Sequence, residues 1–409
     1  MRKVAICGMG VISPVGNGVP EFWSNIKAGV CAVDRITKFD TTDFKVKLAC
    51  EVRGFDPLNY MEKSEARKQD LFTQYAVAAA DEAVRDSEIA GAVTPERLGV
   101  YFGSGIGGMN TFALEHDHLL NGGPRRVSPF FIPMLISNMA AGTIAIIHNA
   151  QGPCLPVVTA CATSTHAIGE AYRAIAYGYA DAIIAGGAEA AVTPLAVAGF
   201  TSCKALTETE DKSAASIPFD ARRSGFVMGE GAGAVVLEEY EHAKARGAKI
   251  YALVEGYANT CDAHHITAPH PEAFGAARAI RLAADEAGYT DDDTVYINAH
   301  GTSTILNDKA ETIAIKQAFK EASKYIHVDS TKSMTGHMLG AAGAVEAIVS
   351  AKALEEGVVP PTVGLCLSDI DCDLDYTPQT AKAAKLTLAL STSLGFGGHN
   401  GVLAFRRAE

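Results

Sequence analysis

The stretch VVTACATSTHAIGEAYRAIAYG, residues 157–178, reads as a β-branched strand, a tight turn carrying Cys161 and a helix of small residues. A second stretch of the same kind, IHVDSTKSMTGHMLGAAGAVEAIVSAKALEEG, covers residues 326–357 and carries Lys332 and His337 in its turn. Each stretch falls late in its half of the chain, and the halves open with the comparable strands KVAICGMG and KIYALVEG. The sequence therefore predicts two copies of one α/β unit, whose strand ends meet at a common site.

Apolar runs alternate with alanine-rich helical stretches along the whole chain. In a helix predicted over residues 63–86, apolar side chains such as Phe72 and Tyr75 repeat at helical spacing. Continuous apolar strands between helices are typical of α/β layers whose sheets are covered on both faces. The strands are predicted at residues 4–12, 98–103, 182–190, 233–239 and 250–256. No Pro/Ser-rich linker is present, so the two units, residues 1–249 and 250–409, are expected to pack closely.

The composition excludes several classes of protein. Of the 409 residues, 48% are hydrophobic and 20% are charged, which is typical of a globular protein. The 35 basic and 47 acidic residues give a net charge of −12, which argues against nucleic acid as the main partner because phosphate binding needs a basic face. Gly8, Gly10 and Pro14 interrupt the apolar start, which favours a buried strand over a signal peptide. No run of 18 apolar residues occurs, so no membrane span is expected.

The nine cysteines are scattered and include no Cys-x-x-Cys pair. This pattern argues against a disulfide framework and against a cysteine-rich zinc site. It predicts a reducing compartment, and we expect the protein to be cytoplasmic.

Cys161 has the setting of a reactive thiol. At the N-terminal end of a helix, the macrodipole and the free backbone N–H groups favour the thiolate, and the same N–H groups can bind an oxyanion. Small neighbours, among them Ala160 and Ala162, leave room for a substrate. A buried structural cysteine is the alternative that this motif alone leaves open.

Two histidines fall at strand ends in the second half. His300 lies in YINAHGTST and His337 lies in KSMTGHMLGAAG, so both could converge with Cys161 on one centre. A lone histidine is more often satisfied in the core or exposed at the surface. The adjacent His264 and His265 point apart, which disfavours joint metal ligation, and no metal site is predicted.

Glycine-rich and basic segments complete the candidate features. Phe396 stands between glycines in LGFGGHNG, where it can swing or expose its backbone N–H, although an ordinary glycine hairpin is the alternative. The glycine-rich segments at residues 8–16 and 103–108 lack the continuation of a dinucleotide fingerprint and are interpreted as tight turns.

Six basic residues are clustered locally in the sequence, and they are typical either of a solvated face or of a docking site for an acidic partner. These are Lys63, Arg67, Lys68, Arg125, Arg126 and Lys204.

In combination these motifs resemble the condensing β-ketoacyl-acyl-carrier-protein synthases over nearly the whole chain. The resemblance is carried by TACATS, NAHGTST, KSMTGHMLGAAGAVEA and LGFGGHNG, together with GPRRVSPFFIPM at 123–134 and PFDARRSGFVMGEGAGAVVLE at 218–238. It implies a thiolase-like five-layer αβαβα sandwich of two duplicated halves. It also implies decarboxylative condensation of malonyl-acyl-carrier protein with an enzyme-bound acyl group, giving 3-oxoacyl-carrier and CO2 in fatty-acid elongation.

The resemblance also assigns expected roles to individual residues. Cys161 is expected to accept the acyl group, and His300 and His337 to complete the triad. Lys332 is expected to join the catalytic set as the supporting lysine near the second histidine, and Glu346 to belong to the ordering network of the same helix. The remaining expectations are an oxyanion hole and gate at Cys161 and Phe396, hydroxyls for the phosphopantetheine arm at Thr302 and Thr304, and an acyl pocket lined by Ile106 and Phe200. His399 stands where many members carry threonine.

The same resemblance implies the partners and the rival functions. We expect no metal or redox cofactor, a carrier protein bearing 4'-phosphopantetheine as the partner, the six basic residues as its docking site, and a homodimer. The near rival is a ketosynthase of a type II polyketide or other specialised acyl pathway. A thiolase and a Cys–His hydrolase explain the two histidines less well. The rival of a different class is a non-catalytic chain-length partner subunit, against which the intact Cys161 argues.

Overall fold

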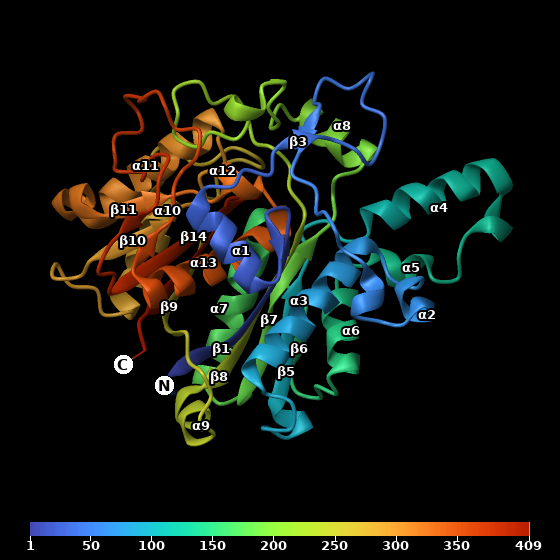
Figure 1. Cartoon of the computed structure of the whole chain (residues 1–409), viewed down its shortest axis with the longest axis horizontal. Coiled ribbons are helices and arrows are strands. Elements are labelled where there is room, and N and C mark those ends of the chain that lie inside the picture. Colours follow the sequence, from blue (N-terminus) through green and yellow to red (C-terminus); the bar gives the residue numbers. More distant parts are fainter. Residues whose placement is uncertain (409) are drawn as a thin grey trace.

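The apolar strands of the chain join in one 11-stranded mixed sheet, as the computed structural model of residues 1–408 describes it (Figure 1). Ten strands follow the spatial order β11-β10-β14-β15-β9-β1-β8-β7-β5-β6, and β2 pairs with β1. In chain order the strands of this sheet are β1 (Val4–Ser13), β2 (Gly16–Asn17), β5 (Leu98–Gly103), β6 (Cys154–Leu155), β7 (Ala182–Glu189), β8 (Gly231–Glu239), β9 (Ala252–Cys261), β10 (Val295–Asn298), β11 (His327–Asp329), β14 (Leu388–Gly395) and β15 (His399–Arg406).

The strand order repeats in the two halves of the chain. The first half contributes β6-β5-β7-β8-β1 and the second contributes β11-β10-β14-β15-β9. In each half the first two pairings are parallel and the next two antiparallel. An antiparallel pairing of β1 with β9, with Val4 opposite Val254, joins the halves. The predicted duplication is therefore present in the topology, although the exact boundary at residue 249 stays a prediction.

Helices complete five layers. On the outer face of the first-half strands lie α3 and α6, and against the second-half strands packs α10, which contacts α11. Between the halves, α7 and α13 pack on each other and contact strands of both halves. These helices are α3 (Leu71–Ser87), α6 (Met139–Ile147), α7 (Thr163–Ala176), α10 (Phe274–Glu286), α11 (Ile305–Phe319) and α13 (Ala342–Glu356). The expected αβαβα sandwich is confirmed.

Small residues allow the two central helices to approach this closely. A Cβ atom added to Gly343 of α13 would lie 2.0 Å from Oγ1 of Thr165 in α7, and one added to Gly169 of α7 would lie 2.2 Å from the Tyr257 ring. The glycine- and alanine-rich composition of the two quoted stretches is therefore a packing requirement of the central layer.

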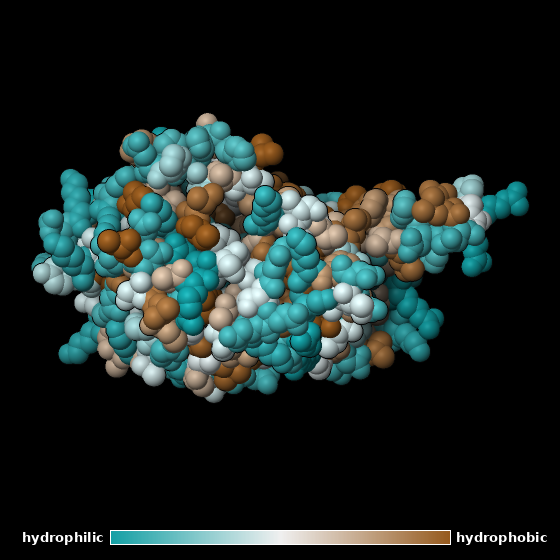
Figure 2. All heavy atoms as spheres, turned by 90° about the horizontal axis from the view of Figure 1, so that it is seen from above, coloured by the Kyte–Doolittle hydropathy of each residue, from teal (hydrophilic) through white to brown (hydrophobic). Residues whose placement is uncertain are grey.

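The remaining elements lie around this body. An arm formed by α4 and α5 projects from it and carries apolar side chains at its surface (Figures 1 and 2). The shorter helices are α1 (Val19–Ala28), α2 (Lys63–Ala66), α4 (Met109–Gly122), α5 (Phe131–Leu135), α8 (Pro194–Ser202), α9 (Tyr240–Ala245) and α12 (Lys332–Thr335). Two small sheets pair β3 (Asp34–Arg35) with β4 (Leu48–Ala49), and β12 (Val358–Val359) with β13 (Lys382–Ala383). Among residues 1–408, no helix combines the length and the apolar character that crossing a bilayer requires.

Two predicted elements were wrong in detail. The helix predicted over residues 63–86 is broken into α2 and α3, because the Asp70 carboxylate accepts a hydrogen bond from the Phe72 N–H and begins a new helix. The segment at 157–160 forms no strand, since the N–H of Thr159 donates to Oγ1 of Thr163 at 2.9 Å instead of to a neighbouring strand.

Candidate active site

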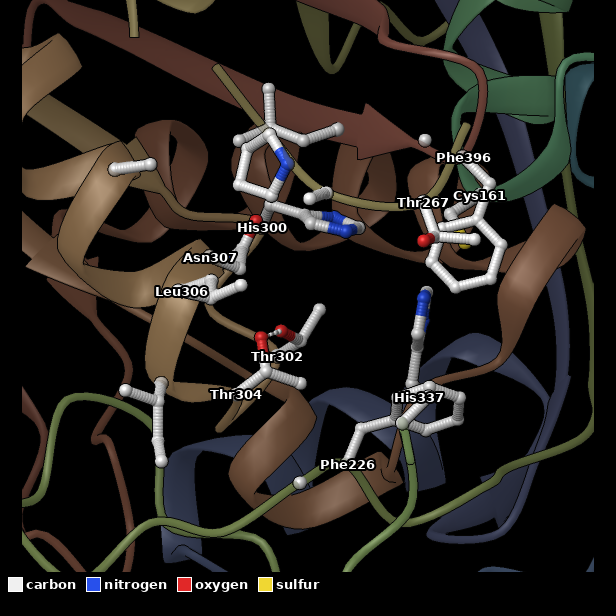
Figure 3. Close-up of a pocket in the computed structure, with 18 of the residues that line it drawn as sticks. Cys161, Phe226, Thr267, His300, Thr302, Thr304, Leu306, Asn307, His337 and Phe396 are labelled. Atoms are coloured by element: carbon white, nitrogen blue, oxygen red, sulfur yellow. Dashed lines mark hydrogen bonds between the residues drawn. The ribbon is translucent and has the colours of Figure 1, made fainter. Parts of the chain in front are cut away.

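A cavity of about 320 Å³ lies where the turns of the two halves meet (Figure 3). Cys161 reaches it from the first half, and His300, His337 and Phe396 reach it from the second. Figure 3 shows both imidazole rings pointing into this cavity beside the cysteine. The convergence that the sequence predicted for these side chains is therefore present.

Cys161 lies in a 3-10 turn, Ala160–Ala162, directly before α7. Ala160 has a φ of 50°, a left-handed conformation that costs a non-glycine residue energy and turns the thiol toward the cavity. Burial raises the pKa of the Cys161 thiol to about 12, while Lys332 and the backbone N–H groups of Phe396 and Cys161 oppose that rise. The prediction of a thiolate at rest was wrong, because desolvation outweighs the N–H groups at the helix start.

His300 follows β10 and is fixed through its backbone. Its N–H donates to Oε1 of Glu311 at 2.7 Å and to Oγ1 of Thr392 at 3.0 Å, and the N–H of Gly301 donates to the second Glu311 oxygen at 2.7 Å. Burial, together with the charge of Lys332, lowers the pKa of His300 well below its usual value. The ring is therefore neutral at physiological pH.

His337 is held in a defined tautomer. The backbone N–H of Leu339 donates to Nδ1 of His337 at 3.3 Å, so the ring hydrogen lies on Nε2. Burial and Lys332 lower the pKa of His337 well below its usual value. Its ring centroid is 5.2 Å from that of His300, at a nearly perpendicular angle of 86°. His337 thus presents a neutral N–H donor to the cavity.

Lys332 and Glu346 form a buried ion pair behind the histidines. Lys332 is 1% exposed and lines no part of the cavity surface, yet its charge lowers the pKa values of His300, His337 and Cys161. Burial raises the pKa of Glu346 to about 7 although Lys332 opposes the rise. Burial is the main reason that both imidazoles are uncharged, and the charge of Lys332 acts in the same direction without touching the reacting atoms.

The walls and mouth of the cavity hold the other predicted residues. Phe396 lies between β14 and β15, and its ring centroid is 6.3 Å from that of Phe200. Thr302 and Thr304 line the cavity with their hydroxyls 2.9 Å apart. Ile106 does not line this cavity but belongs to the apolar cluster that contains Phe200 and Cys161.

The basic residues lie outside the cavity with one exception. Lys204 lines its mouth, and the other five are exposed, at α2 and the turn directly after it and on the segment that follows α4. Lys68 lies 5.9 Å from the Phe130 ring centroid, which brings these two regions together. Lys68 also pairs with Glu65 at 2.8 Å, whereas Lys63 and Arg67 form no ion pair within residues 1–408.

Sequence reasoning missed several residues of the site. Glu311 and Glu189 are fully buried carboxyl groups that accept backbone N–H bonds from the site's turns. Thr267 and Asn307 line the cavity. For Glu189 the sequence did contain a signal, because this glutamate is the last residue of the apolar strand AIIAGGAE, where a charged side chain is unusual.

Comparisons with known proteins agree with this architecture. The family model described as beta-ketoacyl synthase, N-terminal domain, matches residues 1–243, and that of the C-terminal domain matches residues 251–366. A 3-oxoacyl-[acyl-carrier-protein] synthase 2 of Staphylococcus aureus (strain COL) is 51% identical over 409 residues, which covers 100% of this chain and 99% of the relative. A protein of the same name from Synechocystis sp. is 47% identical over 410 residues, covering 100% and 99%.

A solved structure shares the whole fold. A ketosynthase of a type II polyketide synthase, in complex with its acyl-carrier protein and bound to the hexaketide, superimposes with a TM-score of 0.91 at 34% identity and covers 100% of both chains. The resemblance carried by the motifs is thus matched by family models, full-length relatives and three-dimensional structure, and the chain belongs to the beta-ketoacyl synthase family.

Proposed function

We propose that the protein is a condensing acyltransferase that joins malonyl-acyl-carrier protein to an enzyme-bound acyl group in fatty-acid elongation, releasing CO2 and 3-oxoacyl-carrier. The observation that carries the proposal is one cavity that holds a thiol and two neutral imidazoles, one of them fixed as an Nε2–H donor. A hydrolase needs a site for an activated water molecule at the acyl-cysteine, whereas decarboxylation needs neutral N–H donors to an enolate oxygen.

In the first step Cys161 attacks the thioester carbonyl of an acyl-carrier. The thiol is protonated at rest, so its proton passes through a neutral imidazole to the departing pantetheine sulfur. The backbone N–H groups of Cys161 and Phe396 face the sulfur and are placed to stabilise the tetrahedral oxyanion. The acyl group is then covalently bound to Cys161.

In the second step malonyl-carrier loses CO2. The electrons of the broken C–C bond pass to the thioester oxygen as an enolate, which hydrogen bonds from His300 and His337 stabilise. The enolate carbon attacks the acyl-Cys161 carbonyl and releases 3-oxoacyl-carrier. Cys161 leaves as thiolate and takes up one proton from solvent, which replaces the proton lost on the pantetheine sulfur, so the cycle needs no resident metal or redox cofactor.

The fatty-acid assignment is favoured over the polyketide alternative. A full-length relative named 3-oxoacyl-[acyl-carrier-protein] synthase 2 reaches 51% identity, against 34% for the ketosynthase of the type II polyketide synthase. A non-catalytic chain-length subunit would not need Cys161, His300 and His337 at one cavity.

Carrier docking is proposed at Lys63, Arg67, Lys68, Arg125, Arg126 and Lys204. Lys204 lies at the cavity mouth, and the other five are exposed outside the cavity, where Lys68 beside Phe130 brings two basic regions together. Such basic positions in a chain of net charge −12 suit an acidic carrier protein. Thr302 and Thr304 would hold the pantetheine arm, and Ile106 and Phe200 would line the acyl chain. All nine cysteines are free, which fits a cytoplasmic enzyme.

We also propose a homodimer. The arm of α4 and α5 exposes large apolar side chains (Figure 2), and so does the edge strand β6; in a monomer these side chains would face water. These include Phe112, Leu119, Leu120, Ile132 and Leu155. Light scattering on the purified protein tests the stoichiometry.

Acyl transfer to Cys161 tests the function. We expect intact-mass analysis to detect an acyl adduct when the protein is mixed with acyl-carrier thioesters, and Cys161→Ala to show none. The preferred chain length separates fatty-acid from polyketide substrates. Absence of an adduct with every carrier-bound acyl group would reject the synthase and favour the non-catalytic subunit.

A further inference from the structure

Glu189 is a fully buried carboxylate that the proposed mechanism does not use. It is the last residue of β7 and accepts four hydrogen bonds. Oε1 accepts from Oγ of Ser104 at 2.9 Å and from the N–H of Ile106 at 3.2 Å. Oε2 accepts from the N–H of Gly105 at 2.9 Å and from the N–H of Gly340 at 3.0 Å. The carboxylate therefore joins one loop from each half of the chain.

The two backbones close tightly on this carboxylate. A Cβ atom added to Gly340 would lie 2.4 Å from the nitrogen of Gly105 and 2.8 Å from Oε2 of Glu189. A Cβ atom added to Gly105 would also lie 2.8 Å from Oε2. Only glycines fit at both positions, so the separation of the two loops is set by the carboxylate between them.

One side of this contact leads to His337. Leu339, which donates its N–H to Nδ1 of His337, has a φ of 49°. A leucine keeps this left-handed conformation only where its surroundings hold it. The next residue, Gly340, is tied to Glu189, so the carboxylate holds the strained turn that fixes the His337 tautomer.

The other side leads to Ile106 and Cys161. Ile106, whose N–H donates to Glu189, belongs to one apolar cluster with Cys161, Phe200 and Leu339. A shift of this loop would therefore change the packing around Cys161 and around the turn after His337.

We propose that Glu189 is a positioning residue of the condensation, which holds the Ile106 loop and the turn after His337 at a fixed separation beside Cys161. The catalytic consequence of this role rests on the proposed function, but the effect of the Glu189 charge on the thiol can be tested without it.

The charge of Glu189 offers a signature that a purely structural residue lacks. Glu189 raises the pKa of Cys161, Lys332 lowers it, and His300 and His337 face the same cavity as neutral rings. Burial raises the pKa of Glu189 itself to about 7, so the carboxylate is ionised over the alkaline range in which the thiol titrates. Removing its charge must therefore shift the Cys161 titration to lower pH.

The experiment compares Glu189→Gln and Glu189→Asp with wild type in the full-length protein. Iodoacetamide labelling of the Cys161 peptide is followed by mass spectrometry against pH, and CO2 release from malonyl-carrier is measured separately. In Glu189→Gln we expect the labelling curve to move to lower pH and CO2 release to fall by up to about 100-fold, since the amide NH2 opposes backbone donors. In Glu189→Asp the charge remains, so the curve stays while CO2 release falls.

Glu238→Gln is the matched control. Glu238 is equally buried but lies at the opposite end of the same strand pair, since β7 and β8 pair Ala182 with Glu238 and Glu189 with Gly231. Its variant is expected to change stability without moving the Cys161 curve. An unchanged curve in Glu189→Gln, or CO2 release that falls only with the folded fraction, would overturn the proposal. If wild type releases no CO2, the proposed function fails, but the labelling curve still tests whether the Glu189 charge affects the Cys161 titration.

Discussion

The turn after β6 and the turn after β11 occupy equivalent places in the two halves, yet they carry different chemistry. Both lead into a central helix, α7 or α13. In the first half, residues 156–162 run directly to α7 and place Cys161 at the cavity wall. In the second half, residues 330–341 insert α12 and a 3-10 turn, which bury Lys332 and present His337.

The difference shows how a duplicated scaffold can build an asymmetric site. The short turn leaves the backbone N–H groups at the start of α7 available around the thiol. The longer turn has room for a buried cation and for a strained Leu339 that fixes a histidine tautomer. In the mechanism that we propose, each half therefore supplies one part of the reaction, the first an acyl acceptor and the second the donors to the enolate.

Removing the reactive side chain of either turn gives the largest expected effect on activity. Cys161→Ala is expected to lose the acyl adduct completely and to keep CO2 release from malonyl-carrier. His337→Ala is expected to keep the adduct and to lose about 10²–10³-fold in condensation, the usual cost of removing one oxyanion donor. Intact mass and CO2 release measured on both variants check this, and loss of both activities in either variant would contradict the division between the halves.

Lys332→Met tests the buried part of the second turn. Removing one partner of a buried ion pair costs about 3–5 kcal/mol of folding stability, because Glu346 is left without its cation. The double variant Lys332→Met/Glu346→Leu is expected to recover part of that loss. Urea unfolding measures the free energy of unfolding of the single and of the double variant. The control Lys324→Met breaks an exposed pair with Glu321 and should leave stability nearly unchanged.

Each half of the chain holds a buried carboxyl group near the site whose pKa is raised to about 7, Glu189 in the first half and Glu346 in the second. A folded pKa above the unfolded value of about 4.5 stabilises the protein at low pH, and this contribution is lost as pH rises through 7. We expect a loss of about 1 kcal/mol per carboxyl between pH 6 and pH 8. Urea unfolding at both pH values should show a flatter dependence in Glu189→Gln and in Glu346→Gln than in wild type.

The smallest effect is expected outside the cavity. Arg67→Glu should raise the KM for acyl-carrier several-fold and leave kcat unchanged, and added salt should reduce the difference from wild type. Lys324→Glu, in the other half of the chain, is the charge-matched control. An equal change in both variants would mean that net charge, and not the α2 surface, attracts the carrier.

Much of the site could be predicted from the sequence because its residues follow strands. Cys161, His300 and His337 each stand beside a β-branched or apolar run, and a duplicated parallel arrangement brings such turns to one edge. The helix break at Asp70 and the unpaired segment at 157–160 were missed, because single side-chain hydrogen bonds decide both. The protonation of Cys161 was also mispredicted, since the helix start is visible in a sequence and the degree of burial is not.

The two-copy α/β architecture, the small-residue central helices and the identity of the reactive side chains can be predicted from the sequence, because each depends on local pattern and residue type. The electrostatics of the site, in contrast, depends on how the chain packs in three dimensions. Glu189 and Lys332 act on Cys161 from segments far away in the chain, and Leu339 sets the His337 tautomer through a strained backbone held by Glu189. Charges and hydrogen bonds of this kind depend on distance and burial, which arise only when the two halves pack together.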